Sequence, residues 1–384
     1  MQTVVSVAHT NLDVDARVQR QLKALSICFN VVCISDGSTK TGWAELRRVP
    51  ITSDQHEPLG TRRARKCRRI LFNWLGLHVK NCSQIPWVRQ CVKELSKFDW
   101  SICIANDILS LVAASQFPNR QIVFDAHEFY PRFKSLTHRS AGEKAAAAIL
   151  HNCLPGVRGI STVSPGLQKL YHDDFGVTPA LIRNCPPWHD IKPTPTKGKR
   201  LRLVHHGLFK QSRGISELVE AVKRLNGQHS LDLYLTGNQS TECFRRLRKE
   251  VDSVPYIRVM DPVPVPSLIT TLNQYDVGVF LLPCTNDNHR YALPNKLFDF
   301  IQARLAVAVS PNQDMASLVK TTDTGVIIPG WNTTALAECL SGLTTESVSK
   351  FKASSGKAAR QLCSENELSN FVSFVSQCCT SRIT

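Results

Sequence analysis

The feature that most constrains this chain is an alternation of short apolar runs with segments of helical periodicity. The runs are rich in Val, Ile and Leu and fit strands buried on both faces, while the intervening segments repeat apolar residues every three or four positions. This order predicts βαβ units and parallel sheets. We expect strands at residues 4–8, 29–34, 101–105, 121–125, 159–163, 201–205, 231–236, 256–259, 277–282 and 305–309, and helices at 16–25, 215–225 and 294–302.

A proline-rich segment separates two halves of similar length. It places four prolines and a basic tail between Asn184 and Arg200, which excludes regular structure there. The prediction is therefore an α/β protein with two Rossmann-like, doubly wound domains that face a cleft. The expected divisions are a first domain over residues 1–186, a linker over 187–200, a second domain over 201–342, and C-terminal helices over 343–384 that pack at the domain junction.

The charge balance indicates an anionic partner. The 47 Lys and Arg residues against 31 Asp and Glu residues give a net charge of +16, which suits nucleic acid, a membrane surface or a phosphorylated ligand. Residues 1–8 resemble a strand more than a signal peptide, and no long uncharged apolar run occurs, so we expect a cytoplasmic protein without a transmembrane span. The 14 cysteines lack a Cys-x-x-Cys pair and are expected to be free thiols rather than zinc ligands.

The densest basic stretch lies between Arg62 and Arg69, with six basic residues among eight. Apolar and aromatic residues follow it directly, ending near Trp74. Such a pattern favours docking on an anionic membrane surface, where each cation near the surface contributes about 1 kcal/mol. A solvated helix face and nucleic-acid binding are the alternatives, and no helix-turn-helix, zinc-finger or RRM signature supports the latter.

The helix predicted at residues 294–302 has features of a phosphate site. It opens with a proline, whose missing N–H costs no hydrogen bond at a helix start. Its N-terminus presents free N–H groups, and Lys296 adds a full positive charge beside them. Asp299 is placed to accept hydrogen bonds from a sugar hydroxyl, although an ordinary surface Lys–Asp pair is the alternative. The buried stripe of this helix is predicted to consist of Leu293, Leu297 and Ile301.

A second stretch of the same kind follows the strand predicted to end at His205. A glycine-containing loop leads to a helix that opens at about Gly214. Gly207 would permit close approach of the backbone to a ligand, and Lys210 and Arg213 would bind a diphosphate together with the helix amides. Two such loops in one predicted domain reinforce each other.

Several short motifs occur in a characteristic order along nearly the whole chain. They are Asp15-x-Arg17, Ala105-Asn-Asp107, Phe124-Asp-Ala-His-Glu128, Thr162-Val-Ser164, Arg183-Asn184, Arg213-Gly214, Leu235-Thr-Gly237, Asp276-Val-Gly278 and Ala292-Leu-Pro-Asn-Lys-Leu-Phe-Asp-Phe300. In these motifs the chain resembles the family 4 retaining glycosyltransferases of the GT-B fold, also called glycosyl transferases group 1.

The resemblance implies a transferase that moves a sugar from a nucleotide-diphosphate donor to an acceptor. The C-terminal domain would bind the donor and the N-terminal domain a glycan or lipid-linked acceptor in cell-surface polysaccharide synthesis. The anomeric configuration would be retained without a metal or other cofactor, in the cytoplasm or peripherally on the inner face of the membrane. The alternatives are a nucleotide-sugar epimerase of the same fold and a degenerate, non-catalytic protein that binds sugar nucleotides.

By this resemblance Lys210, Arg213 and Lys296 neutralise the donor diphosphate. Asp299 stands where the family has the second Glu of a Glu-x7-Glu motif, which usually holds the ribose, and Tyr291 stands at the place of the first. The implied donor-binding set is Gly207, Lys210, Arg213, Tyr291, Leu293, Asn295, Lys296 and Asp299.

His127 corresponds to a family histidine near the donor sugar, which implies a polarising or hydrogen-bonding role on sugar hydroxyls. The alternative is a histidine that caps the following loop. His127, Lys296 and Arg213 form the implied catalytic set, with the leaving phosphate rather than a protein base accepting the acceptor's proton. The implied acceptor-side residues are Asp15, Arg17, Asp107 and Glu128.

Overall fold

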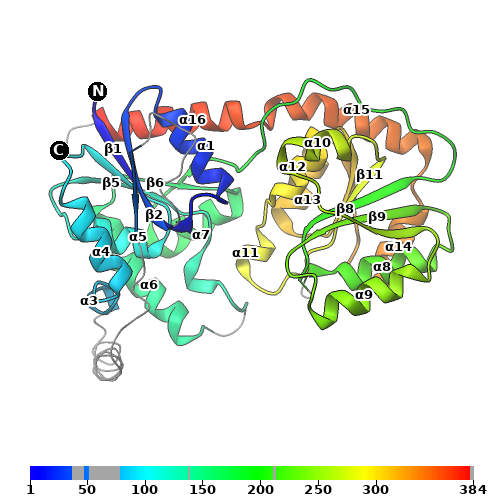
Figure 1. The fold of residues 1–384 in the computed structure, drawn as a ribbon, viewed down its shortest axis with the longest axis horizontal. Coiled ribbons are helices and arrows are strands. Elements are labelled where there is room, and N and C mark those ends of the chain that lie inside the picture. The colour runs from blue at the N-terminus through cyan, green and yellow to red at the C-terminus, as the bar shows by residue number, and fades with distance from the viewer. Residues whose placement is uncertain (37–46, 52–77, 137–138, 211–212, 381–384) are drawn as a thin grey trace. The chain divides into compact units, whose positions relative to one another are not determined.

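The computed structural model describes residues 1–36, 47–51, 78–136, 139–210 and 213–380. The chain divides into two compact units, one of Met1–Arg183 with Leu368–Thr384 and the other of Asn184–Glu367 (Figure 1). The basic stretch between Arg62 and Arg69 lies outside the described residues. None of the helices within the described ranges is long and apolar enough to cross a membrane.

The first unit is built on a parallel sheet whose described strands have the order β3-β2-β1-β4-β5-β6-β7. The winding direction reverses at β1, as in doubly wound folds. The strands are β1 (Thr3–Asn11), β2 (Asn30–Asp36), β3 (Arg47–Pro50), β4 (Ile102–Ala105), β5 (Gln121–Asp125), β6 (Gly159–Thr162) and β7 (Ala180–Leu181). The helices are α1 (Ala16–Leu25), α3 (His78–Cys82), α4 (Pro86–Leu95), α5 (Ile108–Ala114), α6 (Ala141–Cys153) and α7 (Pro165–Phe175), with short 3-10 helices at Tyr130–Arg132 and Leu154–Gly156.

One face of this sheet is covered by α1 and by the end of α16 (Ser364–Thr380). Val4 of β1 and Leu22 of α1 belong to the same buried cluster as Phe371 of α16. The helix α16 begins in the second unit and has its residues from Leu368 onward in the first. The apolar residues of α16 from Phe371 onward thus belong to the core of the first unit.

The second unit contains a parallel sheet with the strand order β10-β9-β8-β11-β12-β13 in its described residues. Its topology is again doubly wound, with the reversal at β8. The strands are β8 (Arg202–Leu208), β9 (Ser230–Thr236), β10 (Ile257–Met260), β11 (Val277–Phe280), β12 (Ala306–Val309) and β13 (Gly325–Ile327). The helices are α8 (Ile215–Arg224), α9 (Glu242–Asp252), α10 (Val265–Leu272), α11 (Asp287–Arg290), α12 (Asn295–Gln302), α13 (Gln313–Thr322), α14 (Thr333–Ser341) and α15 (Thr345–Gln361).

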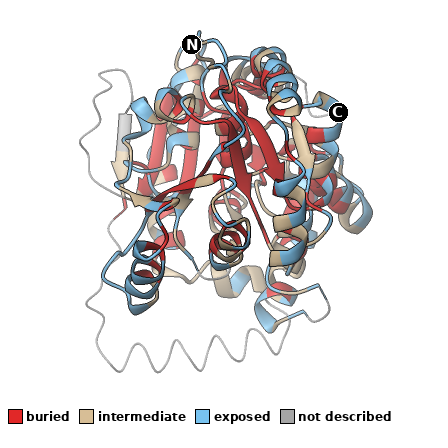
Figure 2. Cartoon of the chain, turned by 90° about the vertical axis from the view of Figure 1, so that its right-hand side faces the viewer, coloured by how far each residue is buried: buried red, intermediate tan, exposed pale blue. Residues whose placement is uncertain are grey.

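Alternate residues of these strands enter separate cores on the two faces of the sheet. Leu233 and Leu235 of β9 pack with α8, α9 and α14, whereas Tyr234 packs with α10, α12, α13 and α15. Because both faces are covered, the strands are buried along most of their length, and the exposed residues lie on the outer sides of the helices (Figure 2). This double burial is why the strands were visible in the sequence as continuous apolar runs.

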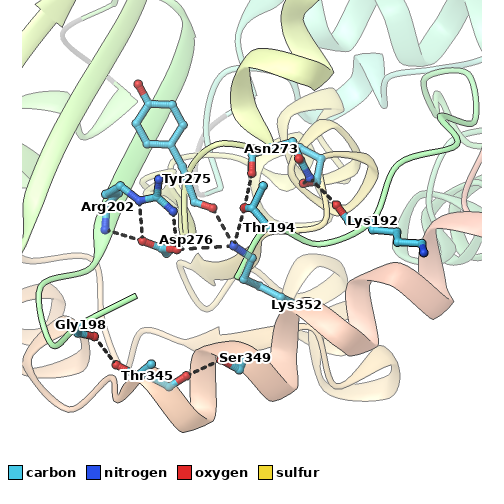
Figure 3. Close-up of polar contacts among 11 residues, drawn as sticks. Lys192, Thr194, Gly198, Arg202, Asn273, Tyr275, Asp276, Thr345, Ser349 and Lys352 are labelled. Atoms are coloured by element: carbon cyan, nitrogen blue, oxygen red, sulfur yellow. Dashed lines mark hydrogen bonds and ion pairs between the residues drawn. The ribbon is translucent and has the colours of Figure 1, made fainter. Parts of the chain in front are cut away.

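The proline-rich segment predicted as a linker is hydrogen-bonded to the second unit. Thr194 Oγ1 donates to the carbonyl of Asn273 at 2.6 Å and accepts from Lys352 Nζ at 3.1 Å (Figure 3). Further along, Thr345 Oγ1 donates to the carbonyl of Gly198 at 2.6 Å. Side chains of α15 and the backbone of the turn after α10 thus form hydrogen bonds with a segment whose prolines lack donors of their own.

Lys352 also connects α15 to the start of β11. It is 1% exposed, and its Nζ donates to the carbonyl of Tyr275 at 2.8 Å and lies 3.5 Å from Asp276 Oδ1 (Figure 3). Asp276 in turn receives two hydrogen bonds of 3.0 Å from the guanidinium of Arg202. A buried ammonium is tolerated in a protein core when it is paired and hydrogen-bonded in this way.

Two predicted boundaries near the candidate site were wrong. The strand expected to end at His205 continues to Leu208, because its ladder with β9 extends through the pairs Gly207–Leu235 and Leu208–Thr236. Gly207 therefore lies inside a strand rather than in a loop. The helix expected to begin at Pro294 begins one residue later, with Pro294 as its N-cap.

Candidate functional site

The candidate donor site of the second unit lies where β8 ends and α12 begins. Lys296, in the first turn of α12, is only 9% exposed, and its Nζ lies 5.3 Å from the centroid of the Phe280 ring. Gly207 has a φ of +118°, and a Cβ there would collide with Cε and Nζ of Lys296. The close approach that the sequence predicted for a phosphate is thus made by the Lys296 side chain.

The charge of Lys296 is only partly compensated. Burial and, after it, the Arg213 cation lower the pKa of Lys296 to about 8, while the Asp299 carboxylate acts in the opposite direction. The ammonium is mostly charged at neutral pH and lies in the first turn of a helix, where free N–H groups also favour negative charge. Its burial excludes the alternative of an ordinary surface Lys–Asp pair.

Two consecutive histidines that the sequence did not single out lie in this cluster. His205 Nδ1 lies 2.9 Å from the carbonyl oxygen of Val279, which can only accept, so Nδ1 carries the proton. Burial, then the Lys296 cation, lower the pKa of His205 to about 4. The sequence signal that could have identified them is a pair of histidines at the carboxyl end of a buried strand, directly before a glycine.

His206 faces Asp299. Its Nε2 lies 3.4 Å from Asp299 Oδ2, and the atom is buried without a hydrogen-bond partner. Burial, then the Lys296 charge and His205, hold the pKa of His206 well below its ordinary value. The imidazole is therefore neutral, and the contact with Asp299 is not an ion pair at neutral pH.

The other predicted donor residues are distributed around this cluster. Arg213 is partly buried and close enough to lower the pKa of Lys296, whereas Lys210 is exposed. Tyr291 is 8% exposed, and the Arg290 guanidinium carbon lies 5.4 Å from the centroid of its ring. Leu293 packs in the hydrophobic core, and Asn295 is exposed.

The loop that leads to Tyr291 is held by a small hydrogen-bond network. His289 Nδ1 lies 2.9 Å from the carbonyl of Pro283, and the backbone N–H of His289 donates to Asn286 Oδ1 at 2.8 Å. Asn312, after β12, donates from Nδ2 to the carbonyl of His289 at 2.7 Å. These contacts fix the loop before α12 without any ligand.

The first unit has its own polar cluster, at the carboxyl end of β5. Asp125, the last residue of that strand, is 1% exposed and accepts hydrogen bonds from Gln21 Nε2 at 2.8 Å and Ser161 Oγ at 2.9 Å. The guanidinium of Arg17, in the first turn of α1, is paired with the same carboxylate through Nη1. Its Nη2 lies 2.9 Å from His127 Nδ1.

The electrostatics of this cluster follow from these contacts. Burial alone would raise the pKa of Asp125. The Arg17 cation, His127 and the two side-chain hydrogen bonds together have a larger effect in the opposite direction, so the pKa is lowered. Burial and then Arg17 lower the pKa of His127 to about 4, against the opposite influence of Asp125 and Asp107. At neutral pH the cluster thus contains one carboxylate, one guanidinium and one neutral imidazole.

The predicted acceptor-side carboxylates differ in their contacts. Asp15 is the N-cap of α1 and accepts from the backbone N–H of Val18 at 3.1 Å. Asp107 is the N-cap of α5 and also accepts from the backbone N–H of His9 at 2.7 Å. Burial raises the pKa of the Glu128 carboxyl. Two of these carboxylates therefore have backbone-capping roles that account for them without a ligand.

The described residues hold no group of three or more His, Cys, Asp or Glu side chains arranged to bind a metal ion.

Comparison with known proteins bears on the second unit and on the whole fold. Residues 200–346 match the family model described as "Glycosyl transferases group 1". No curated protein sequence matches the chain. Sucrose-phosphate synthase from Thermosynechococcus elongatus has a similar structure with a TM-score of 0.73 and 14% identity, covering 98% of this chain and 99% of that one.

Two further solved structures cover both chains almost completely. A glycosyltransferase from Rickettsia africae has a TM-score of 0.70 at 13% identity, with 99% of each chain covered. HepE from Anabaena, solved in complex with UDP and glucose, has a TM-score of 0.69 at 13% identity, with 98% of this chain and 100% of that one covered. At such identities the likeness establishes the fold, two parallel Rossmann-like sheets as in GT-B proteins. The family match covers β8 to α14, so this part of the second unit is similar to glycosyl transferases group 1, and the chain as a whole has a GT-B-like fold.

Proposed function

We propose that this protein is a glycosyltransferase of the glycosyl transferases group 1 (GT4) family that uses a UDP-sugar, retains the anomeric configuration, and passes the sugar to a glycan or lipid-linked acceptor of the cell surface without a bound metal. The observation that carries the donor assignment is the buried Lys296 ammonium in the first turn of α12. Support for the nucleotide comes from fold neighbours, since HepE is solved with UDP-glucose and an E. coli trehalose-6-phosphate protein with UDP-2-fluoro glucose. A lipopolysaccharide outer core galactosyltransferase, WaaB, is a further neighbour and supports the acceptor class.

The role that we propose for the second unit is to stabilise negative charge. As the bond between sugar and diphosphate breaks, negative charge accumulates on the leaving diphosphate. Lys296, which is largely buried, and the partly buried Arg213 supply positive charge, and a buried charge stabilises a developing anion more than one in bulk solvent does. Asp299, beside the neutral His206, is the acceptor we assign to a ribose hydroxyl.

The residues of the first unit are assigned to the sugar. We assign His127 to a hydroxyl of the donor sugar, and Glu128 to the acceptor side because its carboxylate is partly exposed at the end of the same loop. In a retaining transfer the departing phosphate takes the proton of the attacking hydroxyl on the same face. The chain itself then needs to supply hydrogen bonds rather than a base.

The decisive experiment measures binding and turnover in one panel. Purified protein is titrated with UDP and incubated with UDP-sugars and candidate acceptors, and released UDP is followed. Lys296→Ala should lose both UDP binding and turnover, whereas Lys357→Ala, at an exposed lysine of α15 in the same unit, should change neither. Turnover that persists in a chelator would agree with metal independence, and a strict requirement for a divalent cation would contradict it.

Two other outcomes correspond to the alternative functions. Interconversion of the UDP-sugar without an acceptor would identify an epimerase. Tight UDP-sugar binding without turnover of any acceptor would identify a non-catalytic binding protein. The observation behind this alternative is that Tyr291 and Asp299 stand in place of two family glutamates. Either outcome would replace the proposed transfer.

We further propose that the protein acts at the cytoplasmic face of an anionic membrane. This rests on the sequence between Arg62 and Arg69, with its six basic residues and the aromatic and aliphatic residues that follow. Sedimentation with vesicles that contain anionic lipid should bring the protein down, less so as salt is raised, because salt screens the attraction. Equal binding to neutral vesicles would contradict the proposal.

A further inference from the structure

The contact between Arg17 and His127 is more specific than a general polar environment. The Arg17 side chain is 12% exposed, and one of its terminal nitrogens is committed to the buried Asp125 carboxylate. That carboxylate is itself held by Gln21 and Ser161. Arg17 is thus fixed at one end of its guanidinium, and the other terminal nitrogen, Nη2, is left pointing at His127 Nδ1 at 2.9 Å.

The chemistry of arginine decides which nitrogen of His127 carries the proton. A guanidinium has five N–H donors, no acceptor, and does not deprotonate in proteins. A hydrogen bond of 2.9 Å to Nδ1 therefore requires Nδ1 to be the acceptor, with its lone pair toward Arg17. The competing contact of Nδ1, as donor to the Asp125 carbonyl, is 3.4 Å long and correspondingly weak. The remaining proton of the neutral ring must then be on Nε2.

The charges around the ring favour the same state. The ring is approached by Arg17 from α1, by Asp125 from β5, and by Asp107 from the start of α5. Protonating Nδ1 would turn two N–H groups toward each other and place two cations in contact. Burial and Arg17 accordingly lower the pKa of His127 to about 4, although both carboxylates act to raise it.

We propose that Arg17 is a positioning residue that fixes His127 as the neutral imidazole with its proton on Nε2, so that His127 meets a ligand hydroxyl as a hydrogen-bond donor and not as a base. The identity of that ligand, a donor sugar, rests on the proposed function, whereas the protonation state does not. Arg17 then acts through His127, in place of the direct acceptor contact that the family resemblance implies for it.

The first test is spectroscopic and uses the full-length wild-type protein without any ligand. The protein is labelled with 15N-histidine, and the His127 signals are identified by their loss in His127→Gln. Protonated and unprotonated ring nitrogens have well-separated 15N shifts, so the tautomer is read directly. At neutral pH we expect Nδ1 unprotonated and Nε2 protonated. A proton on Nδ1, or on both nitrogens, would overturn the proposal.

The second test removes the arginine. In Arg17→Met the midpoint of the His127 titration should move upward by about one pH unit or more, because the repelling cation is gone and Asp125 is left uncompensated. Should that variant fail to fold, Arg17→Met combined with Asp125→Asn removes both buried charges, and Nδ1 should then gain a share of the proton. Arg17→Lys keeps the cation and should retain the wild-type tautomer. An unchanged tautomer in the double variant would contradict the role of Arg17.

The matched control is Arg120→Met, an exposed arginine of the same unit that bonds Asp99 and the Trp100 carbonyl. It should leave the His127 signals unchanged. A confirmed tautomer in a protein that turns over no UDP-sugar would overturn the proposed function and leave this inference standing.

Discussion

The two polar clusters, one in each unit, differ in how their charges are balanced. In the first unit the Asp125 carboxylate is matched by the Arg17 guanidinium, and Gln21 and Ser161 supply its other hydrogen bonds. In the second unit Lys296 and Arg213 raise a positive potential that Asp299 compensates only in part. The first cluster is closed by its own contacts, and the second has an excess of positive charge that suits an anionic ligand.

This difference in charge balance separates a role in folding from a role in ligand binding, which sequence motifs alone do not distinguish. Substitutions in the balanced cluster of the first unit should chiefly change folding, because they leave a buried partner unpaired. Substitutions in the positive cluster of the second unit should chiefly change ligand binding, because the folded protein without ligand already bears the cost of gathering like charges. The following predictions test this separation, beginning with the largest effect.

Asp125→Ala should lower the free energy of unfolding by about 3–5 kcal/mol, since it leaves the Arg17 guanidinium buried without its counter-charge. Urea unfolding at pH 7 measures the change. Asp99→Ala is the control, because Asp99 is 93% exposed in its pair with Arg120 and should contribute less than about 1 kcal/mol.

The same pair of variants has a defined pH dependence. The pKa of Asp125 is lowered below its ordinary value of 3.8, so its contribution is fully present above that pH and is lost as the pH falls through the lower, folded-state pKa. The gap between wild type and Asp125→Ala should therefore persist at pH 5 and narrow only below about pH 4. If the difference in unfolding free energy between wild type and Asp125→Ala disappeared between pH 7 and pH 5, a group other than Asp125 would be responsible for it.

Lys296→Met should weaken UDP binding by roughly 10- to 150-fold, equivalent to the loss of one charge-assisted hydrogen bond of about 1.5–3 kcal/mol. Its unfolding free energy should stay the same or rise, because a lowered lysine pKa means that the buried charge is unfavourable in the fold. Calorimetric titration with UDP and urea unfolding measure the two quantities. If Lys296→Met lowered the unfolding free energy as much as Asp125→Ala does, the two clusters would not differ in their contribution to folding.

Raising the pH from 7 to 9 should weaken UDP binding by up to about tenfold, since the pKa of Lys296 is about 8 and the ammonium is lost across this range. Over the same range the lysine's contribution to stability should rise, because the unfolded state binds the proton that the folded state has released. Binding and stability thus change in opposite directions. In Lys296→Met, UDP binding and stability should both change less with pH over this range. If UDP binding and stability of the wild type changed in the same direction, the assignment of the titration to Lys296 would be contradicted.

Asp15→Ala gives the smallest expected effect, a loss of about 1 kcal/mol for one N-cap hydrogen bond. Asp15→Asn should retain the stability because asparagine caps equally well. Comparing the acceptor KM of the two variants separates the cap from the acceptor-side role that the family resemblance implies. A raised KM in Asp15→Asn at full stability would favour the acceptor role.

The sequence was sufficient for much of the architecture. Parallel strands that are buried on both faces appear as apolar runs, and the bounds of 16–25 and 121–125 agree with the structure. Elements with weaker periodicity, such as β13 (Gly325–Ile327) and α14 (Thr333–Ser341), were missed. The end of β8 was misplaced because Gly207 resembles a loop residue in sequence, while the ladder to β9 that retains it in the strand is a long-range contact.

Residues of the candidate site could be named by type from the sequence, but their contacts could not. Lys296, Arg213 and Asp299 could be named from their place at a helix start, and His127 from a motif. The partners of these residues come from other elements: His206 from β8 for Asp299, and Arg17 from α1 for His127. No local spacing connects residues 110 positions apart.

The sequence by itself determined the fold class of this protein, two doubly wound α/β halves, and its resemblance to GT4 transferases, because periodicity and short motifs are local properties of the chain. The tertiary structure decided the chemical state of the candidate-site residues. Burial and neighbouring charges set whether Lys296 is an ordinary ammonium or one with a pKa of about 8, and which nitrogen of His127 holds the proton. Such states depend on distances across the fold, which arise only when strands and helices distant in sequence pack together.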